Sequence, residues 1–186
     1  MIGARLVPLL VDAGHDVAGL TRTPAKVDRL REQGAEPVVC DVFDLEGLRE
    51  ALITFGPDLV LSQLTDMPDD RGRLPEQAEA MRRMCRVGTH NMVAAARDAD
   101  AERLIAQSVA WSLPGENGMA VEDHERAVLA EGGLVIRYGR FFGCGTYFAA
   151  ELPPEPRIHV NEAAHRTMAA LDTAGGVIVV AEDPPE

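Results

Sequence analysis

The stretch that decides the fold is residues 1–22, which read MIGARLVPLLVDAGHDVAGLTR. Its first apolar residues recur at helical spacing, and Gly14 supplies a stop signal. The next residues predict a short strand that ends beside Arg22. A helix, a glycine, a strand and a basic residue form the second half of a nucleotide-binding βαβ unit. The opening strand and its glycine turn do not precede Gly3, which stands alone before the helix.

The composition limits the class of protein. A chain of 186 residues is long enough for one domain with a core and short for two. The net charge of −12 argues against a nucleic-acid partner, because phosphates would be repelled. Three widely spaced cysteines fit neither a zinc site nor a disulfide framework, which favours a cytoplasmic location. No apolar run is long enough for a membrane span.

Strand and helix signals alternate along the chain, which predicts an α/β fold with a doubly wound, mainly parallel sheet. Expected strands cover 15–22, at the end of the first unit, and 36–41, 58–64, 103–109, 134–138 and 176–180. Expected helices cover 25–34, 45–55, 78–98, 120–131 and 161–171. Loops are expected at 65–77, at 112–118 and over most of 139–156. We expect one domain over 1–186, in which about 139–186 adds small elements on the substrate side.

Several short motifs resemble the short-chain dehydrogenase/reductase superfamily, in its extended or atypical NAD(P)-dependent epimerase/dehydratase branch. The similarity covers nearly the whole chain, and its strongest part is Arg137-Tyr138-Gly139-Arg140 followed by Gly143-Cys144-Gly145-Thr146. The other carriers are Ile2-Gly3, Thr21-Arg22, Asp41-Val42, Gly88-Thr89-His90-Asn91, Gln107-Ser108 and Ile158-His159-Val160-Asn161-Glu162-Ala163. The resemblance implies a Rossmann-like fold that is incomplete at its N-terminus.

The resemblance implies a bound NAD(P) dinucleotide. Gly3 would be the last of three glycines that let a pyrophosphate approach the helix N-terminus, where unpaired N–H groups favour negative charge. Arg22 stands where an acidic residue would hold the ribose of NAD, and an arginine suits the 2′-phosphate of NADP. NADP is therefore expected over NAD, and the alternative is a surface arginine at a strand end. It is also open whether this chain alone binds either cofactor.

Two further segments take cofactor roles from the resemblance. Asp41 and Val42 would touch the adenine, although Asp41 can equally be a turn or cap residue. Gln63, Leu64 and Thr65 would pass under the ribose and the nicotinamide.

The catalytic residues of the superfamily are only partly present. By resemblance, Ser108 would polarise a substrate oxygen. The usual tyrosine four residues before a lysine is missing, because neither Tyr138 nor Tyr147 has a lysine at that spacing. Alignment of the expected helix at 120–131 places Asn117 and Val121 at those two positions, and neither transfers protons.

His124 and Tyr138 are candidate substitutes for the missing pair. His124 titrates in a useful range, but its neighbours are polar and the segment can simply be a solvated helix face. Tyr138 ends a strand, where ligands gather in doubly wound sheets, but it can equally be packed in the core. Ser108 with His124 hints at a hydrolase, yet no Gly-x-Ser-x-Gly turn surrounds Ser108.

The absent first strand has a structural cost. In this fold it lies in the middle of the sheet, and its loss removes about eight hydrogen bonds worth about 1 kcal/mol each. We expect either that the natural protein starts upstream of Met1, or that a rearranged sheet or an exchanged strand fills the gap.

We expect an NAD(P)-binding epimerase/dehydratase- or reductase-like protein that acts on a small polar or sugar-like substrate. The alternatives are a nucleotide-sensing or interaction protein without redox chemistry, and a non-redox isomerase or cyclase. By resemblance, a homodimer would form through the helices at 78–98 and 120–131.

Overall fold

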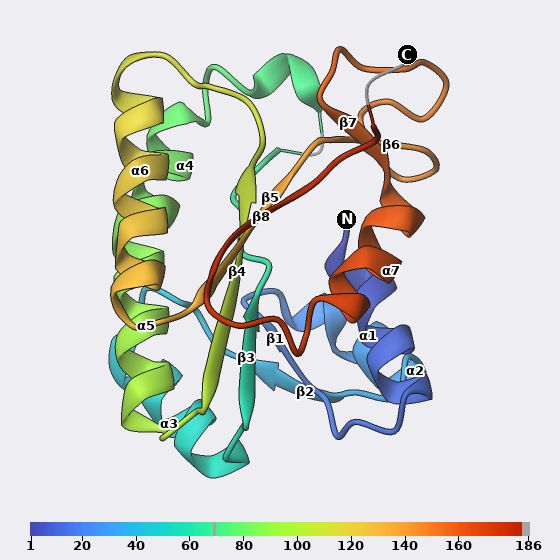
Figure 1. The fold of residues 1–186 in the computed structure, drawn as a ribbon. Helices are drawn as coiled ribbons and strands as arrows, with labels where there is room; N and C mark the ends of the chain where they lie inside the picture. The colour runs from blue at the N-terminus through green and yellow to red at the C-terminus, as the bar shows by residue number, and fades with distance from the viewer. Residues whose placement is uncertain (69, 184–186) are drawn as a thin grey trace.

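The computed structural model describes residues 1–68 and 70–183. It confirms the α/β, Rossmann-like architecture, with helices on both sides of parallel strands (Figure 1). The helices are α1 (Gly3–Asp12), α2 (Val27–Glu32), α3 (Leu45–Phe55), α4 (Ala78–Arg83), α5 (Thr89–Asp98), α6 (Gly115–Ala130) and α7 (Val160–Ala169). The strands are β1 (Ala18–Thr21), β2 (Glu36–Val39), β3 (Leu59–Ser62), β4 (Arg103–Val109), β5 (Leu134–Tyr138), β6 (Arg140–Phe142), β7 (Arg157–His159) and β8 (Gly176–Val180).

The strands form three separate parallel sheets. Four strands pair in the order β3-β4-β5-β8, β1 pairs with β2, and β6 pairs with β7. Among the described residues β1 and β3 share no ladder, so the main sheet is divided where we expected a strand to be missing. Strand β1 beside this gap is poorly covered, since Leu20 is 37% exposed.

Alternation along the strands divides the core into two layers. Ile105 and Ile136 pack in a cluster with residues of α1 and α7. Leu104 and Val135 point to the opposite face and pack in a cluster with residues of α3, α5 and α6. Figure 1 shows the same division, with α3 to α6 on one side and α1, α2 and α7 on the other. Both faces are therefore buried, as expected for parallel strands.

Helix α1 contains a proline in its interior, Pro8. A proline has no N–H, so the carbonyl of Ala4, four residues earlier, loses its helical donor. The side-chain Nε2 of Gln33 donates to that carbonyl at 2.9 Å. This bond replaces the missing one and ties the end of α2 to α1.

Three expectations about elements were wrong in part. The expected helix at 78–98 contains a π-helical turn, η3 (Met84–Gly88), between α4 and α5. Helix α6 begins at Gly115, inside the expected loop, where the extended backbone of Pro114 precedes its first residue. The carbonyl of Leu113 approaches Gly118 so closely that a side chain there would collide with it. The expected loop at 139–156 contains β6, whose partner β7 follows it.

Short 3-10 turns, η1 (Pro24–Lys26) and η2 (Arg71–Arg73), interrupt two other connections. None of the helices in the described ranges is long and apolar enough to cross a membrane.

Cys40, Cys85 and Cys144 are free thiols, and burial raises the pKa of Cys40 and Cys85. The single-domain division and the cytoplasmic location stay predictions.

Candidate cofactor and substrate site

The candidate residues from the sequence lie at or just beyond the carboxyl ends of strands, with Gly3 at the start of α1 and His124 on α6. Arg22 follows β1, the pair Asp41-Val42 follows β2, Gln63-Leu64-Thr65 follows β3, Ser108 lies near the end of β4 and Tyr138 ends β5. In doubly wound folds ligands bind at this edge.

Arg22 is bound by a carboxylate that the sequence did not single out. Its Nη2 donates to Oδ1 of Asp66, which lies in the loop after β3. The Asp66 hydrogen bond raises the pKa of Arg22 against the opposing effect of burial, and the charge of Asp41 adds to the increase. The Arg22 side chain is still 49% exposed, whereas that of Asp66 is 17% exposed.

Asp41 and Val42 form a turn beside this pair. Asp41 Oδ1 accepts a hydrogen bond from the backbone N–H of Phe43 at 3.0 Å, the turn role that we considered as the alternative. Val42 is buried, and its carbonyl accepts from Asn91 Nδ2 at 2.8 Å. The turn is thus fixed from the side of α5, while Asp41 stays exposed.

The segment after β3 is held to β4. Gln107 Nε2 donates to the carbonyl of Leu64 at 2.6 Å, and Thr65 is exposed. The buried amide atoms of Gln63 have no hydrogen-bond partner in the described parts of the chain. The Gln63 amide nevertheless lies close enough to the Tyr138 hydroxyl to lower the pKa of that group.

Tyr138 is a core residue, 2% exposed. Thr167 Oγ1 donates to the carbonyl of Ala163 at 2.7 Å, so the Tyr138 hydroxyl is the donor in its 2.6 Å bond to Thr167. Burial raises the pKa of Tyr138 to about 12, with the hydrogen bond to Thr167 acting in the opposite direction. The hydroxyl is therefore neutral near pH 7 and poorly suited to proton exchange.

Ser108 belongs to a charged cluster around the buried carboxylate of Glu125. Its Oγ donates to Glu125 Oε1 at 2.5 Å, and Arg137 donates to both oxygens of Glu125, at 2.9 and 2.5 Å. Burial by itself raises the pKa of Glu125, but the hydrogen bonds from Arg137 and Ser108 outweigh it and lower the pKa. The Ser108 hydroxyl has a single hydrogen, and this hydrogen is used in the bond to Glu125. The hydroxyl is therefore not free to donate a hydrogen bond to a substrate.

His124 bridges a helix and a strand. Its Nε2 donates to the carbonyl of Gln107 at 2.8 Å, so Nδ1 accepts from the Thr89 hydroxyl at 2.6 Å. Burial lowers the pKa of His124, and the hydrogen bond to Gln107 only partly opposes this. The imidazole is therefore neutral near pH 7, and both of its nitrogens are engaged by groups other than Ser108.

Asn117 and Val121 occupy the positions of the missing tyrosine and lysine, and neither side chain transfers protons. Asn117 Oδ1 accepts from Arg82 Nη1, on α4, at 3.0 Å, and Val121 is apolar. Arg82 was not found from the sequence, because 35 residues separate it from Asn117 and no local spacing links them. The pair offers hydrogen-bond donors that carry a fixed positive charge, but no group that gives up a proton near pH 7.

The substrate-side segment closes over the start of α1. Arg5 donates to Asn161 Oδ1 at 2.9 Å and to the carbonyl of Cys144. The Arg140 guanidinium lies 4.4 Å from the centroid of the Trp111 ring. A hollow of about 210 Å³ is lined by residues 142, 143 and 148–152.

Comparison with known proteins assigns the family. Residues 1–132 match the model of a family described as NAD(P)H-binding. The chain belongs to this family. The chain is also 31% identical, over 228 residues, to a 3-diazoavenalumate denitrifying reductase from a Streptomyces species, with 100% of this chain and 74% of the relative covered. An NAD(P)-dependent family of the short-chain dehydrogenase/reductase type is thus confirmed.

Solved structures of epimerases share the fold of this NAD(P)H-binding protein. The UDP-glucose 4-epimerase of Thermus thermophilus, in complex with NAD, matches with a TM-score of 0.79 and 17% identity. The UDP-glucose 4-epimerase of Thermotoga maritima, with UDP-glucose, matches with a TM-score of 0.78 and 13% identity. Each match covers 97% of this chain and 74% of the epimerase. At these identities the likeness establishes the fold alone.

The residues present fit a dinucleotide at two points. A Cβ placed on Gly3 meets no atom of the described chain within 4 Å, so internal packing does not require glycine there. Close approach of a pyrophosphate to the start of α1 would require it. The buried Gln63 amide, which has no hydrogen-bond partner in the described chain other than the nearby Tyr138 hydroxyl, lies just beyond the end of β3, where the resemblance places the nicotinamide and the ribose.

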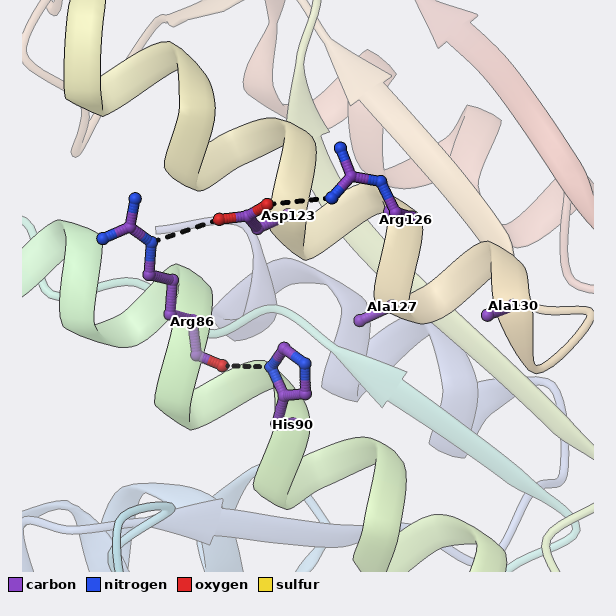
Figure 2. Close-up of a pocket in the computed structure, with 6 residues that line it drawn as sticks. All are labelled: Arg86, His90, Asp123, Arg126, Ala127 and Ala130. Atoms are coloured by element: carbon purple, nitrogen blue, oxygen red, sulfur yellow. Dashed lines mark hydrogen bonds and ion pairs between the residues drawn. The ribbon is translucent and has the colours of Figure 1, made fainter.

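A separate cavity of about 460 Å³ lies between α6 and the η3–α5 segment (Figure 2). There Asp123 pairs with Arg86 at 3.2 Å and with Arg126 at 3.0 Å. His90 donates to the Arg86 carbonyl at 2.7 Å. Ala127 and Ala130 complete the lining, so charged groups of both signs surround a floor of small side chains.

Proposed function

We propose that this protein is an NAD(P)H-dependent reductase whose substrate accepts hydride without a proton from a Tyr–Lys pair. The observation that carries the proposal is the site itself, where Asn117 bound by Arg82 and the apolar Val121 replace that pair. The name of the Streptomyces relative describes a reductase that removes nitrogen from a diazo compound. We therefore propose a diazo or diazonium compound as the substrate class.

The chemistry of that substrate fits the residues. When bound, the reduced nicotinamide supplies a hydride. Reduction of a carbonyl leaves an alkoxide that needs a proton, and nucleotide-sugar epimerisation moves protons in both directions. Hydride addition to an aryl diazonium cation forms a C–H bond, and the C–N bonding pair leaves with dinitrogen. Charge and atoms then balance without a proton donor.

In this proposal the three candidate catalytic residues stabilise the structure of the site through hydrogen bonds. Ser108 orients Glu125, His124 ties α6 to β4, and Tyr138 ties β5 to α7.

The cofactor residues follow the strand ends. We propose that Gly3 allows the pyrophosphate to approach, that Arg22 binds the 2′-phosphate of NADP, and that Asp41 and Val42 contact the adenine. Gln63, Leu64 and Thr65 would lie under the ribose and the nicotinamide.

A second copy of the chain is the proposed protein partner. The face in Figure 2 carries both charge signs beside small alanines, which suits self-pairing about a two-fold axis. Val87 and Met119, 44% and 58% exposed, add apolar surface to the same group of helices.

A second candidate function has support from the same site. Ser108, His124 and Tyr138 are all committed to internal hydrogen bonds, which also suits a nucleotide-sensing protein without turnover.

One experiment separates the two functions. NADPH and NADH oxidation is followed by nicotinamide absorbance with an aryl diazonium salt, an aryl ketone and UDP-glucose, and dinitrogen release is measured in parallel. We expect consumption of reduced cofactor with the diazonium salt alone, above the rate with heat-denatured protein. Measurable cofactor binding without such consumption contradicts the reductase and supports the sensor.

A further inference from the structure

We propose that Asp66 competes with the 2′-phosphate of NADP(H) for Arg22 and so sets the preference of this protein between NADP(H) and NAD(H). The inference rests on the proposed cofactor role of Arg22 and adds a residue that lowers, rather than raises, phosphate affinity.

The geometry of the ion pair carries the inference. Asp66 Oδ1 accepts the Nη2 hydrogen bond of Arg22, and the two residues come from different connections, after β3 and after β1. The Arg22 side chain is 49% exposed and accessible to a ligand, whereas the Asp66 side chain is 17% exposed. A phosphate that binds Nη2 must therefore replace Asp66, and one that binds Nη1 or Nε lies beside the Asp66 carboxylate on the same guanidinium.

The loop that carries Asp66 is fixed on its far side. The carbonyl of Pro68 accepts from the Tyr147 hydroxyl. Arg71 lies 3.7 Å from the Glu151 carboxylate and 4.4 Å from the centroid of the Phe148 ring. The Tyr147–Pro68 bond, two residues from Asp66, ties this part of the connection to the substrate-side segment.

The local charge makes the competition selective. The negative charge of Asp41 also acts on Arg22, in addition to the contact with Asp66. The 2′-phosphate of NADP carries about two negative charges and is repelled by Asp66. NAD has a neutral hydroxyl at this position and does not need the guanidinium. Asp66 therefore lowers the affinity for NADP(H) and leaves that for NAD(H) almost unchanged.

The test uses adenosine 2′,5′-bisphosphate and adenosine 5′-monophosphate, which report on this end of the site alone, together with NADPH and NADH. Their dissociation constants are measured by calorimetry for the full chain and for Asp66→Asn, Arg22→Ala and the double variant. Asp172→Asn is the matched control, because Asp172 also pairs with an arginine, Arg103, where β4 begins, at the opposite edge of the sheet.

We expect Asp66→Asn to lower the dissociation constants of the bisphosphate and NADPH by about fivefold, as loss of one partly exposed ion pair allows. The dissociation constants of the monophosphate and NADH should change less than about twofold, and Asp172→Asn should change none of the four. In the Arg22→Ala background, Asp66→Asn should tighten binding of the bisphosphate less than in the wild-type background, because only the direct repulsion by Asp66 is then removed.

Each remaining result has a defined meaning. If Arg22→Ala weakens the bisphosphate but Asp66→Asn leaves it unchanged or weaker, the inference is wrong and the cofactor role of Arg22 stands. If Arg22→Ala has no effect, or the wild-type chain binds none of the four probes, the proposed cofactor site fails and the inference fails with it.

Discussion

Arg137 on β5 donates two hydrogen bonds, at 2.9 and 2.5 Å, to the buried carboxylate of Glu125 on α6. Ser108, which lies beside Arg137 in the β4–β5 register, donates a third at 2.5 Å. One carboxylate thus fastens a helix to two adjacent strands at the edge where the substrate would bind.

Replacement of Glu125 by glutamine should destabilise the protein by about 1–3 kcal/mol, because Arg137 and Ser108 lose a charged acceptor. The lower end is expected if the Arg137 side chain, 42% exposed, is rehydrated. Denaturant unfolding measures the effect, and Glu122→Gln on the same helix is the matched control, since Glu122 is exposed. Equal stabilities of the two variants would show that the cluster contributes nothing.

Acidification should weaken the protein through His124. Its folded-state pKa lies below the ordinary 6.5, so its contribution to stability is complete above pH 6.5 and falls as the pH drops below that value. The depressed pKa of Glu125 adds a second loss at lower pH. Unfolding free energies between pH 8 and pH 5 should fall less steeply for His124→Gln than for wild type. Parallel slopes would contradict this assignment.

Tyr138→Phe should cost about 1 kcal/mol of stability, the usual value of one hydrogen bond, because Thr167 keeps its bond to Ala163. It should leave any turnover near pH 7 within about twofold, since a neutral hydroxyl with a pKa of about 12 is not the proton donor. The raised pKa of Tyr138 stabilises the folded wild-type protein below pH 10, and this stabilisation is lost as the pH rises towards 12. The phenylalanine variant should not show this alkaline loss of stability. A large loss of turnover would assign Tyr138 a catalytic role.

Gly3→Ala should separate stability from cofactor binding. The added Cβ meets no described atom within 4 Å, and alanine favours helix, so the melting temperature should stay the same or rise. NADPH affinity should fall about tenfold or more, because the methyl group occupies the approach of the pyrophosphate. Unchanged affinity would remove Gly3 from the cofactor site.

Ala130→Glu should weaken a dimer formed through the face in Figure 2, by adding a charge at a small contact residue. Ala169→Glu is the control, because Ala169 is likewise exposed and is likewise the last residue of its helix, on the other side of the fold. Light scattering at micromolar concentration should show more monomer for Ala130→Glu alone. A monomeric wild type would refute the proposed partner.

The sequence predicted best the elements whose signal is local. The bounds of β4, β5 and β8 agree with the expected strands, since each contains at least three consecutive apolar residues. Strands β6 and β7 have three residues each, too few for a period, and were missed. Likewise, the start of α6 depends on the contact of Gly118 with the Leu113 carbonyl, which no propensity describes.

For the site, chain order placed the candidate residues at the strand ends but could not provide their partners. Asp66 reaches Arg22 across 44 residues, and Thr89 reaches His124 across 35. Such pairs depend on how helices and strands pack. The sequence therefore predicted the positions of these residues at the strand ends, whereas the internal hydrogen bonds of Ser108, His124 and Tyr138 needed the structure.

The bond from Gln33 to the Ala4 carbonyl makes two distant positions interdependent in evolution. With Pro8 present, loss of the Gln33 amide leaves a helical carbonyl without its donor. With alanine at position 8, the helix supplies its own N–H and almost any residue suits position 33. The favourable order of substitution is therefore glutamine first and proline second, and reversal of either change depends on the other.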